Sequence, residues 1–128
     1  MSDSLAKTVN NESIQLMVNT FYPKILKDPV VSGFFIEKLG ADINSKVWQE
    51  HLLLLGQFWS LMSLGDEGYR GSPLAPHFQI EGLSREAFEQ WLFLFQETVD
   101  EIFIPKLGLF FKEKSSDIAQ NFMRNLGI

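Results

Sequence analysis

The chain has 128 residues, which is enough for one domain with a single buried core. Apolar residues make up 45% of it, and 12 Phe and 3 Trp give it a composition typical of a folded protein. A formal charge of −5 without a Lys/Arg cluster argues against binding to nucleic acid or to a membrane surface, and the absence of cysteine excludes disulfides and thiolate metal sites.

The N-terminal segment shows no targeting signal. Residues 1–10 are polar and lack the basic and apolar regions of a signal peptide, and no apolar run is long enough to span a bilayer. We therefore expect a cytoplasmic protein in which residues 1–10 form a flexible tail and residues 11–128 form the folded domain.

The first predicted helix begins near Asn11, which we expect to be its N-cap. Apolar residues then recur at steps of three and four, which predicts one buried helical face. This face consists of Ile14, Met17, Val18, Phe21, Tyr22 and Ile25. Pro29 and Gly33 end the region, and the aromatic pair Phe34-Phe35 after them is expected to form a turn.

A second long helix is predicted to begin near Asn44 or Ser45. Its broad apolar face contains Trp48, His51, Leu55, Phe58, Trp59 and Met62. Residues 65–73 are rich in Gly, Ser and Pro and predict a loop, and residues 74–78 are expected to form a short helix or a turn.

Two further helices complete the predicted fold. Ser84 is expected to cap the third, and Pro105 suits the first turn of the fourth. The third has an apolar stripe with Trp91 beside it, and the stripe is Phe88, Leu92, Phe95, Val99 and Ile102. The fourth has the stripe Leu107, Phe110, Phe111, Ile118, Phe122 and Leu126. Because no stretch alternates with period two, we predict an all-α fold of four substantial helices.

The chain contains two histidines, and each has a structural and a chemical interpretation. His51 lies on an apolar helical face, where a lone histidine is most often hydrogen-bonded to a neighbour. His77 lies between Pro76 and Phe78 in the loop-rich middle, where a solvated side chain is the simplest interpretation. No third ligand stands at zinc-site spacing, and no GxSxG, HExxH or phosphate-binding glycine loop supports a hydrolase or transferase.

Six short motifs occur in a fixed order along the chain. They are Phe21-Tyr22, Phe34-Phe35, Trp48-x-x-His51, Phe58-Trp59, Tyr69-x-Gly71-x-Pro73-x-x-x-His77 and Phe88-x-x-Trp91-Leu92-x-Leu94-Phe95. Each pair is weak by itself, but the string from residue 69 to residue 95 is specific. Together, over about residues 11–126, the motifs resemble those of the truncated globins, most closely group III of that family.

The resemblance implies an all-α, shortened globin fold in which a two-over-two helical sandwich surrounds haem b, so residues 11–128 would be a truncated globin domain. His77 matches the proximal iron ligand, which would bind through Nε2. Three residues match the polar positions on the distal, gas-binding side: Tyr22, His51 and Trp91. The remaining pocket residues implied by the resemblance are Phe34, Phe35, Leu55, Phe58, Tyr69, Arg70 and Phe88.

One position departs from the family pattern. In many truncated globins a basic residue one turn past the distal histidine anchors a haem propionate, whereas Leu54 stands at that place here. Arg70 or Lys38 would have to provide the anchor instead. The run Leu52–Leu54 is either an exposed apolar strip at a subunit contact or part of a more deeply buried helix.

The leading functional hypothesis is binding of a diatomic gas at haem iron within a polar distal cage. The gas would be oxygen, nitric oxide or carbon monoxide, and slow release would favour redox detoxification (nitric oxide dioxygenase or peroxidase-like chemistry with an unidentified reductase) over oxygen transport. We expect a monomer or weak dimer. Two alternatives remain: a haem-based sensor or electron-transfer module with His51 as the sixth iron ligand, and a helical interaction domain without haem.

Overall fold

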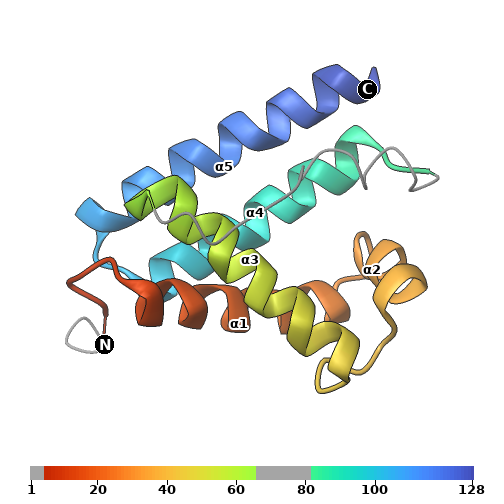
Figure 1. Ribbon diagram of the computed structural model, residues 1–128. Helices are drawn as coiled ribbons and strands as arrows, with labels where there is room; N and C mark the ends of the chain where they lie inside the picture. Colours follow the sequence, from red (N-terminus) through yellow and green to blue (C-terminus); the bar gives the residue numbers. More distant parts are fainter. Residues whose placement is uncertain (1–4, 66–81) are drawn as a thin grey trace.

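The computed structural model describes residues 5–65 and 82–128, and within these two ranges the chain is helical with no strand. The five helices are α1 (Asn11–Lys27), α2 (Ser32–Leu39), α3 (Lys46–Leu64), α4 (Arg85–Ile102) and α5 (Pro105–Leu126). α1 packs against α2, α3 and α4, and α4 packs against α5 (Figure 1). The helices thus form two layers, α1 with α3 and α4 with α5, and the all-α prediction is confirmed.

The first helix begins one residue earlier than predicted, and the N-cap is Asn10 rather than Asn11. The Asn10 side chain accepts a hydrogen bond from the backbone N–H of Ser13, and the Ser13 hydroxyl accepts one from the backbone N–H of Asn10. This reciprocal capping box satisfies two backbone donors at the start of α1.

The starts of the three other long helices agree with the prediction. Ser45 and Ser84 are the N-caps of α3 and α4. Each has an extended backbone conformation, and its side chain accepts a hydrogen bond from a backbone N–H of the first turn. Pro105 occupies the first turn of α5. Because these signals act over only three residues, they are readable from sequence alone.

The aromatic pair Phe34-Phe35 lies within a helix, so the predicted turn is wrong. Asp28 ends α1, and its carboxylate accepts the backbone N–H groups of Val30 and Val31, which redirects the chain directly into α2. With α2 added, the described part of the chain has five helices instead of the four expected.

The core between the two layers is rich in aromatic rings. An interior aromatic cluster, which we define as Trp59, Phe95, Phe103 and Phe111, joins α3, α4 and α5. Trp59 stacks on Phe95 with ring centroids 5.0 Å apart, and Phe103 stacks on Phe111 at 4.9 Å. Such contacts add to the burial of the rings and hold the layers together.

The segment before α1 contacts the folded body. The backbone N–H of Ala6 donates to the Ile102 carbonyl at 2.7 Å, and the N–H of Ile104 donates to the Ala6 carbonyl at 3.2 Å. The flexibility expected for residues 1–10 stays a prediction. Among the described helices, none combines the length and apolar character needed to cross a bilayer.

Candidate functional site

Tyr22, His51 and Trp91 come from three different helices, and the structure brings their side chains together. Tyr22 on α1 is buried and shares a side-chain hydrogen bond with Trp91 on α4. Because an indole N–H is a donor only, Trp91 donates and the Tyr22 oxygen accepts. Burial raises the pKa of Tyr22 well above its usual range, and this bond partly opposes the shift. The phenol therefore stays protonated at physiological pH.

His51 on α3 packs against Tyr22. Their ring centroids lie 6.1 Å apart at an interplanar angle of 85°. The imidazole is half-buried, and burial lowers the pKa of His51 below its ordinary value. At neutral pH the ring is therefore uncharged, with one nitrogen able to donate a hydrogen bond and the other able to accept one or to bind a metal.

Trp48 lies at the centre of these rings, although the sequence analysis did not place it in the pocket. Its ring stacks on Phe35 of α2 at 6.2 Å and meets His51 edge-on at 5.6 Å. It also lies against Tyr22, with ring centroids 5.8 Å apart. Its position on the apolar face of the predicted helix could have identified it. A tryptophan on such a face is expected to be buried, and its indole N–H then needs a hydrogen-bond partner nearby.

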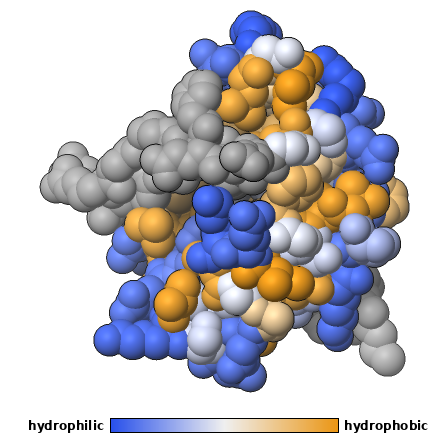
Figure 2. All heavy atoms as spheres, turned by 90° about the vertical axis from the view of Figure 1, so that its right-hand side faces the viewer, coloured by the Kyte–Doolittle hydropathy of each residue, from blue (hydrophilic) through white to orange (hydrophobic). Residues whose placement is uncertain are grey.

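Further apolar side chains belong to the same core as these rings. Phe34, Leu55 and Phe58 are half-buried at the edge of the core, as are Leu39 and Met62, which the sequence analysis did not assign to the site. Figure 2 shows the molecule from the side on which α2 lies, where apolar side chains reach the surface among polar ones. A partly open apolar surface of this kind suits a large, flat, apolar ligand.

Phe88 lies in a second, smaller cluster. Its ring packs near Phe122 at 6.4 Å, together with Ala119 and Met123 of α5. Its place in a haem pocket therefore stays a prediction. Three other predicted pocket or ligand residues, Tyr69, Arg70 and His77, lie outside the described residues, as do the short helix expected at 74–78 and most of the loop at 65–73.

The leucine run on α3 divides between core and solvent. Leu52 is 5% exposed, whereas Leu53 is 59% and Leu54 is 40% exposed. Leu54, which stands where many truncated globins have a basic residue, thus presents an uncharged side chain at the surface. Lys38, the alternative anchor proposed from sequence, is exposed in the last turn of α2.

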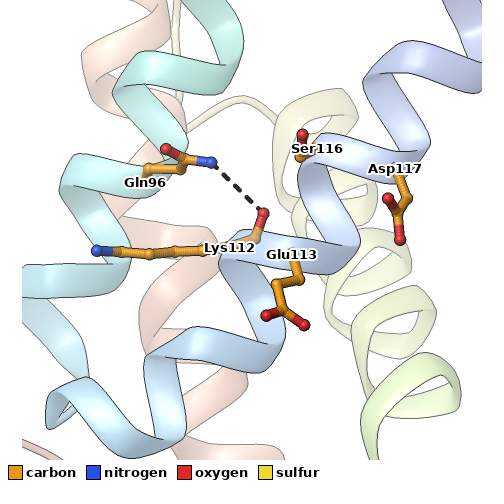
Figure 3. Close-up of a pocket in the computed structure, with 5 residues that line it drawn as sticks. All are labelled: Gln96, Lys112, Glu113, Ser116 and Asp117. Atoms are coloured by element: carbon orange, nitrogen blue, oxygen red, sulfur yellow. Dashed lines mark hydrogen bonds between the residues drawn. The ribbon is translucent and has the colours of Figure 1, made fainter.

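A polar groove lies on another part of the molecule, between α4 and α5 (Figure 3). It is lined by Gln96, Lys112, Glu113, Ser116 and Asp117. The Gln96 amide donates to the Lys112 carbonyl at 3.4 Å, and the Lys112 ammonium pairs with Asp100 at 2.6 Å. None of its residues belongs to the predicted site. In the described ranges, no group of three His, Cys, Asp or Glu side chains is arranged to hold a metal ion.

Comparisons with known proteins bear directly on the predicted family. No protein-family model matches the chain. A curated group 3 truncated hemoglobin of Campylobacter jejuni is 32% identical over 120 residues, which cover 94% of this chain and 93% of that protein. A crystal structure of a group III truncated hemoglobin from Campylobacter jejuni matches with a TM-score of 0.88 and 32% identity, over 95% of this chain and 94% of that one. The shortened globin fold is confirmed, and the chain belongs to the group 3 truncated haemoglobins, a family of haem globins.

Proposed function

We propose that this chain binds haem b through His77 and binds a diatomic gas, oxygen in particular, beside Tyr22, His51 and Trp91. The observation that carries the proposal is the convergence of these three polar side chains, from α1, α3 and α4, within aromatic surroundings. Apolar walls with a few placed polar groups are the usual composition of a gas-binding haem pocket.

The described residues fit a haem. The Phe35 ring lies 5.7 Å from the Tyr22 ring, and Phe34 and Phe35 are both half-buried at the edge of the core. Bound haem would supply an iron coordination site at which a diatomic gas can bind. The assignment of His77 as the proximal ligand rests on its place in the family motif between α3 and α4.

Tyr22 is suited to donate a hydrogen bond to the gas. Its oxygen accepts a hydrogen bond from Trp91, and a phenol can donate its own proton at the same time. A hydrogen bond to a charged group contributes about 1.5–3 kcal/mol, so this one donor would slow gas release by roughly one to two orders of magnitude. His51, being uncharged, can donate a further bond or accept the Tyr22 proton.

Slow release favours chemistry on the gas over its transport. Nitric oxide oxidation is one such reaction: nitric oxide, oxygen and one electron yield nitrate, and the electron would come from a separate reductase. A peroxidase-like reaction is the other. In either reaction a protonated phenol beside the bound gas could donate a hydrogen bond to it, and Tyr22, whose pKa is raised by burial, stays protonated.

An absorption spectrum of the ferric and ferrous protein tests the proposal. We expect a strong Soret band that weakens or shifts in His77→Ala. His51→Ala is the matched control, because it also removes one imidazole and should retain the haem. No Soret band after haem is added would contradict the proposed function and favour a haem-free interaction domain. A normal band in His77→Ala would contradict the ligand assignment alone.

A sensor or electron-transfer module is the second candidate. The observation that favours it is the lowered pKa of His51, which leaves a ring nitrogen unprotonated and able to bind iron. A low-spin, six-coordinate ferrous spectrum that becomes five-coordinate in His51→Ala would support it. A five-coordinate ferrous spectrum in the unmodified protein would exclude it.

A further inference from the structure

We propose that Trp48 is a positioning residue of the gas-binding site: it holds the distal side chains in their mutual arrangement without reaching the gas itself. The inference rests on the proposed function and adds a residue to it. Trp48 has no exposed surface. Its ring contacts the site from the first turn of α3, and it meets rings from three helices, namely Tyr22, Phe35 and His51.

These contacts fix three different orientations. Phe35 lies nearly parallel to Trp48, at 25°, whereas His51 stands at 86° to it. Tyr22 is tilted by 49°. Because α1 and α2 carry two of these rings and α3 carries the third, one indole sets the spacing between all three helices at the distal side.

One hydrogen bond holds the indole in this position. Its Nε1–H donates to the Gly40 carbonyl at 2.7 Å. Gly40 ends α2 with a φ of 86°, in the region that favours glycine. The bond therefore ties the end of α2 to the first turn of α3. A buried donor without an acceptor is costly because it has lost its hydrogen bonds to water, so a rotated indole is disfavoured.

The consequence concerns the donors rather than the fold. The Tyr22 hydroxyl and the His51 nitrogen can act on a gas only if their rings stay aligned, and Trp48 is the ring that both of them contact. Loss of its N–H would release the end of α2 and let Phe35 and Tyr22 shift. The hydrogen bonds from Tyr22 and His51 to the gas would then adopt several geometries. They would be weaker on average, because small misplacements weaken such bonds steeply.

The test compares Trp48→Phe with Trp59→Phe in the haem-loaded protein. Both variants replace a buried tryptophan of α3 by a smaller ring. The ring contacts of Trp59 are with Phe58, Phe95 and Phe111, none of which is a distal polar residue. The measurement is the infrared C–O stretching band of the ferrous carbon monoxide complex, which reports the distal hydrogen bonds, together with the oxygen release rate.

For Trp48→Phe we expect the C–O band to split or broaden toward higher frequency and oxygen release to become several-fold faster. Trp59→Phe should keep the original band. An unchanged band in Trp48→Phe, or the same change in both variants, would overturn the positioning role. In either case a normal Soret band would leave the proposed function standing, so the two failures are distinguishable.

A measurement on the unmodified protein covers the case in which Trp48→Phe does not fold. The indole N–H of Trp48 should exchange slowly with solvent in an NMR experiment, and its chemical shift should change when carbon monoxide binds. Rapid exchange, or a shift that ignores the ligand, would overturn the inference.

Discussion

Two groups of aromatic rings meet on α4, and they are built differently. One is the distal group, by which we mean Tyr22, Phe35, Trp48, His51 and Trp91, and the other is the interior aromatic cluster. The Trp91 ring of the first group stacks on the Phe95 ring of the second, with ring centroids 5.3 Å apart. The distal group carries a polar atom on nearly every ring: a phenol, an imidazole and two indoles. The interior cluster is hydrocarbon apart from the indole of Trp59.

This difference in polar atoms suggests different roles: ligand binding for the distal group and stability for the interior aromatic cluster. In the distal group, Trp48 and Trp91 have their N–H groups bonded to Gly40 and to Tyr22 respectively. The protonated Tyr22 phenol can still donate its own proton, and the uncharged His51 ring can donate one hydrogen bond and accept another. The interior cluster consists of three hydrocarbon rings and one indole that fill the core. Changes there should lower stability, and changes in the distal group should alter ligand behaviour.

The largest expected effect on stability comes from the interior cluster. Phe111→Ala removes a fully buried ring that packs on Phe103 and Trp59, and we expect it to lower the free energy of unfolding by about 3–5 kcal/mol. Phe93→Ala is the control, since Phe93 is 62% exposed and its loss should change stability by about 0.5 kcal/mol or less. Urea unfolding of the haem-loaded protein measures both. Equal losses would mean that the interior cluster is not the stabilising centre.

The double variant Tyr22→Phe with Trp91→Phe should affect oxygen release most. We expect the release rate to rise by roughly ten- to a hundredfold, because the Tyr22 donor is lost and the Trp91 N–H cannot replace it. Tyr22→Phe alone should have a smaller effect, since the Trp91 N–H then loses its acceptor and can turn to the ligand. Stopped-flow kinetics measure the rates. An unchanged rate in the double variant would mean that these residues are not the gas-stabilising donors.

The smallest expected effect is on the pH dependence of stability. Burial lowers the pKa of His51 in the folded state, so the unfolded chain binds a proton more readily as the pH falls through the ordinary histidine value of about 6.5. Stability that is present above this value is therefore lost below it. The melting temperature should fall more between about pH 7.5 and about pH 5.5 in the unmodified protein than in His51→Gln. The reverse order would contradict the burial of this imidazole.

Much of the fold was predictable because its signals are local. The caps at Ser45 and Ser84 and the proline at residue 105 mark helix starts within a single turn, and the stripes of apolar residues predict which faces are buried. The two local errors also have local causes. Asn10 and Asn11 are equally plausible N-caps until the position of the Ser13 hydroxyl is known. The chain reverses at Asp28, whose carboxylate accepts backbone N–H groups, and not at Phe34 as predicted.

The candidate site was predictable only as a set of residues. From its own residues and the family motifs, the sequence predicted the helices, the apolar faces and the candidate site residues Tyr22, His51, His77 and Trp91. Only the tertiary structure decided that the Trp91 N–H meets the Tyr22 oxygen and that Trp48 bonds to the end of α2. Helical periodicity specifies which side of a helix is buried, but it does not specify which residue of another helix that side will meet.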